Sequence, residues 1–224
     1  MVHLLFEQSG TFRDEFKALG FDAKDYDIQN EYGRTDIICD IFEEIRHAYN
    51  NTPSILDQIG GGEYVFAFFP CTQFETQKTM WFRGVNCSQR NWSDVQKVEY
   101  AMRLHKTLHE YYELVCMLVL LAIKRGWKFV VENPHSEDHY LRRYFPIPAT
   151  LVDKDRTRDG DYFTKPTAFW FVGFKPQCNL VMEPLKIVKK RQVEKLRPNS
   201  KERSEISPQY ARRFIKQYII DEDL

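Results

Sequence analysis

Apolar positions along the chain follow two periods, and the change from one to the other marks the expected elements. Short runs in which nearly every residue is apolar, such as residues 65–69, are typical of strands buried on both faces. Apolar residues three or four positions apart, such as Phe12, Phe16 and Leu19, indicate amphipathic helices. Strands are expected at residues 3–6, 23–27, 36–40, 64–69 and 128–131, with the rest of the sheet at 149–152, 167–174 and 180–184.

The helical pattern is longest between residues 94 and 125, where Gly126 is expected to end it. Further helices are expected at residues 12–19 and 41–50, and Ser207 and Pro208 predict the start of a last helix that ends near residue 220. Residues 80–92 are polar and aromatic without a period and are interpreted as a loop. Residues 192–205 are interpreted as a linker or flexible loop.

The alternation of strands and helices predicts an α/β fold with a doubly wound, mostly parallel sheet. A chain of 224 residues, 43% of them hydrophobic, is long enough for one such domain and too short for two. We expect a catalytic domain at residues 1–185. Residues 186–224 are expected to form a basic linker and a C-terminal helix that packs on the same domain.

The five cysteines are scattered and never spaced as Cys-x-x-Cys, which argues against a disulfide framework or a zinc ribbon and favours a reducing compartment. The N-terminus has no basic segment followed by an apolar one. The longest apolar run, residues 114–123, is about half of a membrane span. The sequence therefore predicts a cytoplasmic protein with no membrane partner.

Two strand ends carry reactive side chains. Pro70 and Cys71 follow the strand at residues 64–69, and Glu132 and Asn133 follow the strand at residues 128–131. Ligands of open α/β sheets bind outside the carboxyl ends of the strands, so the thiol and the carboxyl are expected to face one cleft. Such a pair suits nucleophilic attack on an electron-poor ring.

These residues also carry a family resemblance. The segments Phe6-x-x-x-Gly10-Thr11, Pro70-Cys71 and Glu132-Asn133-Pro134, in this order, resemble the cytosine-C5 DNA methyltransferase family from residue 3 to about residue 134. The resemblance is strongest to short, phage-like members without a large target-recognition domain. Such members share a Lys-Pro-Thr-x-x-Trp element, found here at residues 165–170, and a Ser-Pro-x-Tyr-Ala-Arg element, found at residues 207–212.

The resemblance implies a Rossmann-like fold and S-adenosylmethionine as the cofactor. It implies that Cys71 adds to C6 of cytosine and that Glu132, its pKa raised by burial, holds a proton at N3. Asn133 would fix the geometry of Glu132, and Arg156 and Arg158 would contact the base and its phosphate, although a plain basic loop is an equal alternative. The residues implied to bind the cofactor are Phe6, Ser9, Gly10, Thr11, Asp27, Ile28, Asp40, Ile41 and Pro70. Asp27 would accept the ribose hydroxyls and Asp40 the adenine amino group, but each could instead be a turn former or helix cap.

The distribution of charged residues along the sequence indicates which partner the protein binds. The net charge is zero, but residues 186–203 contain eight Lys and Arg against two Glu, and a second basic cluster lies between residues 142 and 165. Double-stranded DNA would be the partner of such clusters, with solvated loops as the alternative. The target base must leave the duplex before it can react.

Two departures from the family pattern qualify the interpretation. Gln8 stands where the family commonly has Gly, which alters the cofactor loop. The absence of a large recognition domain predicts low sequence selectivity or a separate specificity partner. The alternatives are a same-fold enzyme that modifies another nucleobase or a free nucleotide, and a non-catalytic nucleic-acid-binding relative.

Overall fold

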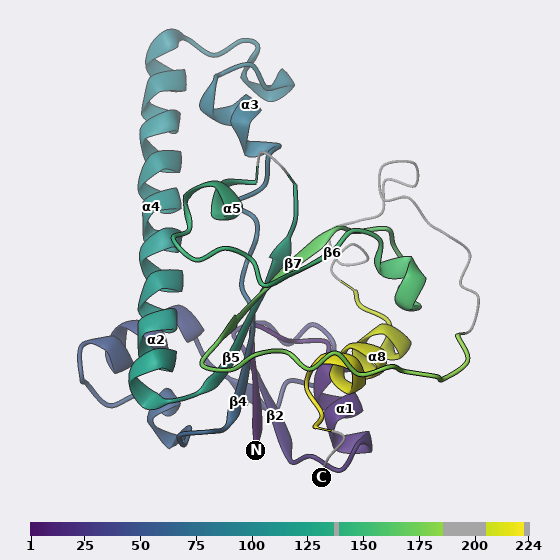
Figure 1. Ribbon diagram of the computed structural model, residues 1–224. Coiled ribbons are helices and arrows are strands. Elements are labelled where there is room, and N and C mark those ends of the chain that lie inside the picture. The colour runs from purple at the N-terminus through teal and green to yellow at the C-terminus, as the bar shows by residue number, and fades with distance from the viewer. Residues whose placement is uncertain (137–138, 186–204, 222–224) are drawn as a thin grey trace.

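Seven strands form one sheet in the computed structural model, which describes residues 1–136, 139–185 and 205–221 (Figure 1). The strands are β1 (Val2–Leu5), β2 (Ala23–Asp27), β3 (Ile37–Ile38), β4 (Tyr64–Phe68), β5 (Lys128–Pro134), β6 (Leu151–Asp153) and β7 (Thr167–Val172). Their order is β3-β2-β1-β4-β5-β7-β6. All neighbours from β3 to β5 are parallel, and β7 is antiparallel to both β5 and β6. The expected mostly parallel α/β sheet is confirmed and is compatible with a Rossmann-like fold.

The strand order contains a reversal. From β1 the chain moves outward to β2 and β3, and then returns past β1 to enter β4 on its other side. Neighbouring loops at such a reversal leave in opposite directions, which opens a crevice at the carboxyl ends of the strands. The crevice is expected between the loops that follow β1 and β4.

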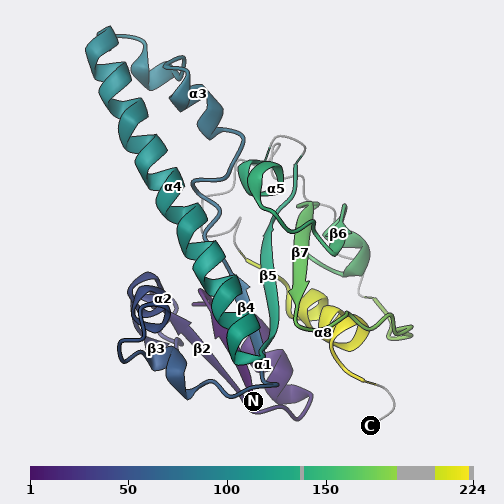
Figure 2. The same ribbon diagram turned by 60° about the vertical axis from the view of Figure 1, so that its left-hand side comes forward.

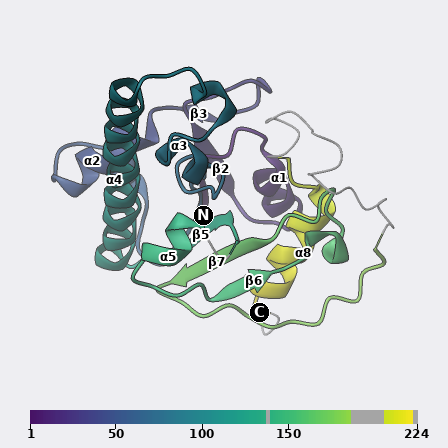
Figure 3. The ribbon, with the colours of Figure 1, turned by 90° about the horizontal axis from the view of Figure 1, so that it is seen from above.

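Helices cover both faces of the sheet (Figure 3). The α-helices are α1 (Thr11–Ala18), α2 (Ile41–Tyr49), α3 (Lys78–Phe82), α4 (Asp94–Arg125), α5 (Tyr140–Tyr144) and α8 (Pro208–Tyr218), and the 3-10 helices are η1 (Ile55–Gln58), η2 (Cys87–Gln89) and η3 (Arg156–Asp159). Helices α2 and α4 pack on one face, and α1 and α8 pack on the other. No helix within the described residues combines the length and the apolar character that crossing a membrane requires.

The continuous apolar runs divide their side chains between two cores. In β4, Val65 and Ala67 join the core beneath α2 and α4, whereas Phe66 joins the core beneath α1 and α8. In β5, Phe129 and Val130 divide in the same way. Because each strand is buried on both faces, it reads as an unbroken apolar run.

The long helix α4 has the predicted bounds. Ser93 caps its first turn by accepting a hydrogen bond from the Gln96 amide, and Gly126 ends it with a left-handed φ of 69°. The N-terminal half of α4 and the short helix α3 project beyond the sheet (Figures 1 and 2). The last helix is also as predicted: Ser207 caps it and Pro208 is its first residue.

Three expectations differ from the structure. Residues 180–184 form no strand, and Leu180 and Met182 are exposed, because the segment leading to them is bonded to the end of α8 through the Gln177 and Asn179 amides and not to a strand. The expected loop at residues 80–92 contains η2 and part of α3, because the Trp81 and Trp92 rings pack on Tyr100 of α4. The expected strand at residues 36–40 is reduced to β3. Within the expected linker, residues 192–204 lie outside the described part of the chain.

Candidate functional site

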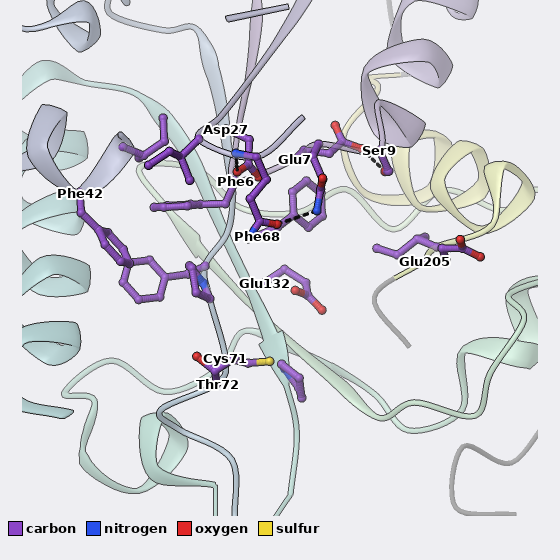
Figure 4. Close-up of a pocket in the computed structure, with 18 of the residues that line it drawn as sticks. Phe6, Glu7, Ser9, Asp27, Phe42, Phe68, Cys71, Thr72, Glu132 and Glu205 are labelled. Atoms are coloured by element: carbon purple, nitrogen blue, oxygen red, sulfur yellow. Dashed lines mark hydrogen bonds between the residues drawn. The ribbon is translucent and has the colours of Figure 1, made fainter. Parts of the chain in front are cut away.

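A cavity of about 460 Å³ lies at the carboxyl ends of β1, β2, β4 and β5. It occupies the crevice that the strand order predicts, and ten of the sequence-predicted site residues line it: Phe6, Ser9, Asp27, Ile28, Asp40, Ile41, Pro70, Cys71, Glu132 and Arg156. Gly10, Thr11, Asn133 and Arg158 do not line it. In Figure 4, Cys71 lies at one end, Glu132 in the middle, and Phe6, Glu7 and Asp27 at the other end.

The turn after β1 begins with a strained residue. Phe6 has a φ of 62°, a conformation that bulky side chains rarely adopt. Its ring is held against Phe42 and Phe69, each with a centroid distance of 5.4 Å. Residues held in such conformations cluster at ligand clamps, so the strain is consistent with a binding role for this turn.

Glu7 caps helix α1 from within the cavity wall. Its carboxylate accepts hydrogen bonds from the Phe12 amide at 2.7 Å and the Arg13 amide at 3.3 Å, and the Thr11 amide donates to Ser9 Oγ at 3.3 Å. Burial raises the pKa of Glu7 to about 8, although the amide hydrogen bonds oppose this shift. The first amides of α1 are therefore engaged by oxygens of the chain itself.

Gly10 has a structural function in this turn. Its φ is 68°, and an added Cβ would lie 2.5 Å from the Arg13 guanidinium. Gln8, where the sequence departs from the pattern of the resembled family, donates from Nε2 to Gln29 Oε1 at 2.7 Å and accepts from the Glu31 amide at 3.1 Å. Gln8 thus ties the turn after β1 to the loop after β2.

Two aspartates line the end of the cavity farthest from Cys71. Asp27, the last residue of β2, accepts from the Gln29 amide at 2.8 Å, and burial raises the pKa of its carboxyl. Ile28 beside it is exposed. Asp40 caps α2 by accepting from the Phe42 amide at 2.9 Å, as the alternative interpretation expected, and it also lines the cavity.

Cys71 follows β4 at the other end of the cavity. Its Sγ lies 3.5 Å from Glu75 Oε1, and burial raises the pKa of the thiol to about 12. The charges of Glu75 and Glu132 add to this rise, whereas the charge of Lys165 opposes it. In the absence of substrate this cysteine is a thiol and not a thiolate.

Glu132 approaches Cys71 through the strand pairing. In the register of β4 and β5, Glu132 lies opposite Phe68. Phe68 comes three residues before Cys71 in the chain. Burial raises the pKa of the Glu132 carboxyl, and the charges of Lys165 and Arg156 oppose the shift. This direction agrees with the sequence-based expectation of a carboxyl held toward its neutral form.

The two arginines expected to act together lie in different environments. Arg156 is buried, its Nη1 is 4.0 Å from Glu132 Oε1, and its guanidinium forms an ion pair with Asp161 and lies 4.8 Å from the centroid of the Tyr210 ring. Arg158 is exposed, with its Nε 3.8 Å from Asp155. Only Arg156 can act within the cavity of the described structure.

Asn133 has a different contact from the one expected. It is fully buried, and its Nδ2 donates to the Phe69 carbonyl at 2.6 Å. This bond joins the end of β5 to the end of β4, directly before Pro70 and Cys71. Asn133 therefore positions the backbone that leads to the cysteine.

Sequence reasoning missed several residues that line the cavity, and Lys165 and Glu7 are the two with the clearest chemical roles. Lys165 influences both Cys71 and Glu132, and it could have been found as the first residue of the Lys-Pro-Thr-x-x-Trp element. Glu7 could not be recognised as a cap, because Gly10 stands at the capping position and the Glu7 carboxylate reaches α1 from outside the helix.

Comparison with known proteins adds no family to these observations. No protein-family model matches the chain, and no curated protein matches it significantly.

Proposed function

We propose that this chain is an S-adenosylmethionine-dependent enzyme that methylates C5 of cytosine in DNA. The observation that carries the proposal is the cavity at the strand-order reversal, which Cys71 and Glu132 share with Asp27 and Glu7. One end of this cavity offers a nucleophile and an acid, and the other offers carboxylates and aromatic rings. The motifs and their order support the same function.

The lining suits a phosphate-free adenosyl cofactor with a cationic group. Dinucleotide cofactors place a pyrophosphate on the first amides of the helix after β1, but here Glu7 and Ser9 engage those amides. Asp27 stands at the end of β2, where a carboxylate can accept ribose hydroxyls. The Glu7 carboxyl can face a cationic amine or sulfonium, whose charge would favour the ionised form that burial opposes. When bound, S-adenosylmethionine would supply an electrophilic methyl group.

The residues at the other end would activate the cytosine ring. The Cys71 sulfur adds to C6 while Glu132 holds a proton at N3, so that negative charge does not accumulate on the ring. Glu75 Oε1, 3.5 Å from the sulfur, can accept the thiol proton. Once C5 is methylated, loss of the C5 proton and elimination of the thiolate restore the aromatic ring.

DNA as the substrate is supported by the basic clusters of the sequence and the resemblance to DNA-modifying enzymes. Residues 142–143 and 156–158 place cations on segments after β5, on the side of the sheet where the cavity opens. The described segments outside the sheet and its covering helices are short, so we propose low sequence selectivity or a separate specificity partner.

A mechanism-based trap tests the proposal. The chain is incubated with S-adenosylmethionine and a pool of duplexes in which 5-fluorocytosine replaces cytosine, and the products are separated on a denaturing gel. The fluorine cannot leave as a proton, so a covalent protein–DNA adduct should accumulate. Cys71→Ala should abolish the adduct, and Cys87→Ala, at an exposed cysteine outside the cavity, should retain it.

The remaining outcomes separate the alternatives. An adduct that persists in Cys71→Ala would show that another group is the nucleophile. Trapping of free 5-fluorodeoxycytidine monophosphate, without trapping of DNA, would favour a nucleotide-modifying enzyme. No adduct and no cofactor binding by calorimetry would favour a non-catalytic relative.

A further inference from the structure

Helix α4 exposes apolar side chains on the face that points away from the sheet. Val95, Val98, Met102, Leu120 and Ile123 are 66%, 60%, 67%, 42% and 56% exposed. Its buried residues, Leu104 and those from Leu114 to Ala122, lie on the opposite face, and those from Leu114 onward belong to the core beneath the helix. Single exposed apolar residues are common, but five on one face of one helix form a patch that requires an explanation.

The spacing of this face is that of a helix-pairing surface. The face that carries these residues, here called the α4 seam, comprises Val95, Val98, Met102, His105, His109, Glu113, Cys116, Leu120 and Ile123. Cys116 is half-buried against the core, and the other members are exposed. Its members recur every three or four residues, with a mean period of about 3.5, which is the period of positions that contact a partner helix in coiled coils. The seam is about 42 Å long at 1.5 Å per residue.

The seam is symmetric about His109. Going outward in both directions from His109, Met102 matches Cys116 and Val98 matches Leu120. Val95 matches Ile123 at the two ends. An antiparallel copy of the same helix, centred on His109, would therefore place apolar residues on apolar residues at both ends.

The polar residues of the seam fit the same alignment. In the antiparallel arrangement His105 of each copy faces Glu113 of the other, so a cation or hydrogen-bond donor meets a carboxylate twice. A parallel arrangement would instead place Glu113 opposite Glu113. All three polar residues, His105, His109 and Glu113, are exposed in the single chain.

We infer that two copies of this chain associate through antiparallel pairing of their α4 seams. A two-fold interface must be self-complementary, and a symmetric seam meets this requirement. The N-terminal half of α4, which carries the exposed Val95, Val98 and Met102, projects beyond the body of the protein (Figures 1 and 2). The cavity contacts the opposite face of α4 through Tyr111, so the dimer would leave the cavity open. The inference does not depend on the proposed function.

Light scattering with size-exclusion chromatography of the full chain tests the association. The intact chain should elute as a dimer at concentrations near 100 µM, about the weak end of specific association. Met102→Glu should shift it to a monomer and weaken the dimer about 100-fold. Arg103→Glu places the same side chain at the next exposed position, off the seam, and should leave the dimer within about threefold of the original. Circular dichroism establishes that both variants remain folded.

A substitution that is expected to strengthen the dimer provides a control, because misfolding of a variant could explain a weaker dimer but not a stronger one. His109→Leu replaces two facing imidazoles at the two-fold axis with an apolar pair and should tighten association about tenfold. A monomeric intact chain that remains monomeric as His109→Leu would overturn the inference.

Disulfide trapping tests the direction of pairing. In a variant whose exposed Cys87 and Cys178 are replaced by Ser, His109→Cys should oxidise to a linked dimer, because only the central position of an antiparallel pair meets itself. Val98→Cys should not form a linked dimer, because it faces Leu120. A linked dimer of Val98→Cys would indicate parallel pairing, and equal effects of Met102→Glu and Arg103→Glu would indicate that another surface or another partner covers the seam.

Discussion

Burial acts on Cys71 and Glu132 in the same direction, with opposite consequences for the proposed chemistry. It raises the pKa of both groups, which keeps Glu132 toward the neutral acid that a proton at N3 requires. The same burial keeps Cys71 a thiol, which is a weak nucleophile. A neutral Glu132 places less negative charge beside the sulfur, and Lys165 supplies positive charge. The charge of Lys165 therefore acts on the pKa of both groups, which couples the ionisation of Cys71 to that of Glu132.

Alkylation of Cys71 should report this coupling. In a variant whose exposed Cys87 and Cys178 are replaced by Ser, iodoacetamide labelling of Cys71 should rise with pH up to its pKa of about 12. Lys165→Met should slow labelling at pH 9, and Glu75→Gln should accelerate it, because each pKa unit changes the thiolate fraction about tenfold. Peptide mass spectrometry gives the rate at Cys71.

Lys154→Met is the control for Lys165→Met, because Lys154 is an exposed lysine outside the cavity. It should leave the labelling rate unchanged. Equal rates in Lys165→Met and the intact protein would contradict the role of Lys165 beside the thiol.

At the scale of elements, the sequence predicted most reliably where local hydrogen bonds set the boundaries. Ser93 and Gly126 are adjacent in sequence to the helix ends they determine, so residues 94–125 could be assigned before the structure. The short helix α3 depends on contacts between Trp81 and Tyr100, which are far apart in sequence and follow no period. The segment at residues 180–184 resembles a strand in sequence, but the Gln177 and Asn179 amides before it donate to carbonyls at the end of α8, so it follows the helix and not the sheet.

Helix α8 depends on a buried ion pair that the sequence did not reveal. Asp161 pairs with Arg156 and also accepts a hydrogen bond from the Ser207 amide at 2.8 Å, which joins the start of α8 to η3. Asp161→Asn would remove the nearer of the two carboxyl groups beside the buried Arg156 charge and should lower the free energy of unfolding by about 3–5 kcal/mol. Urea unfolding followed by circular dichroism measures the change.

Asp159 provides a matched comparison two residues earlier. Its ion pair with Arg213 of α8 spans 2.8 Å but is partly exposed, so Asp159→Asn should cost only about 0–1 kcal/mol. Similar losses in the two variants would show that the buried pair has no special role in attaching α8.

At the scale of the whole molecule, the site follows from the order of the strands. The sequence identifies Asp27, Cys71 and Glu132 as residues at or near strand ends, but it does not state which strands are neighbours. Their convergence depends on β4 pairing with both β1 and β5. The side-chain partners of Asn133 and Arg156 within the protein depend on the same packing, so the sequence alone did not give the Phe69 carbonyl or Asp161 as their partners.

The distribution of charge across the molecule leads to the last prediction. If phosphate contacts provide most of the DNA affinity, binding should fall steeply with salt and vary little among duplex sequences. Lys189, Lys190 and Arg191 belong to the basic segment of the sequence that lies outside the described residues. Replacing all three with Ala should weaken every duplex by a similar factor and reduce the slope of log affinity against log salt by up to about three units.

Three lysines at the amino end of the sheet, Lys17, Lys24 and Lys128, provide the control, because they lie away from the edge where the cavity opens. Their replacement with Ala removes the same charge from the molecule, so any effect of net charge alone would be common to both triple variants. Fluorescence anisotropy over a salt series distinguishes the two. Equal slopes for the two variants would show that long-range charge, and not phosphate contact by the basic segment, determines DNA affinity.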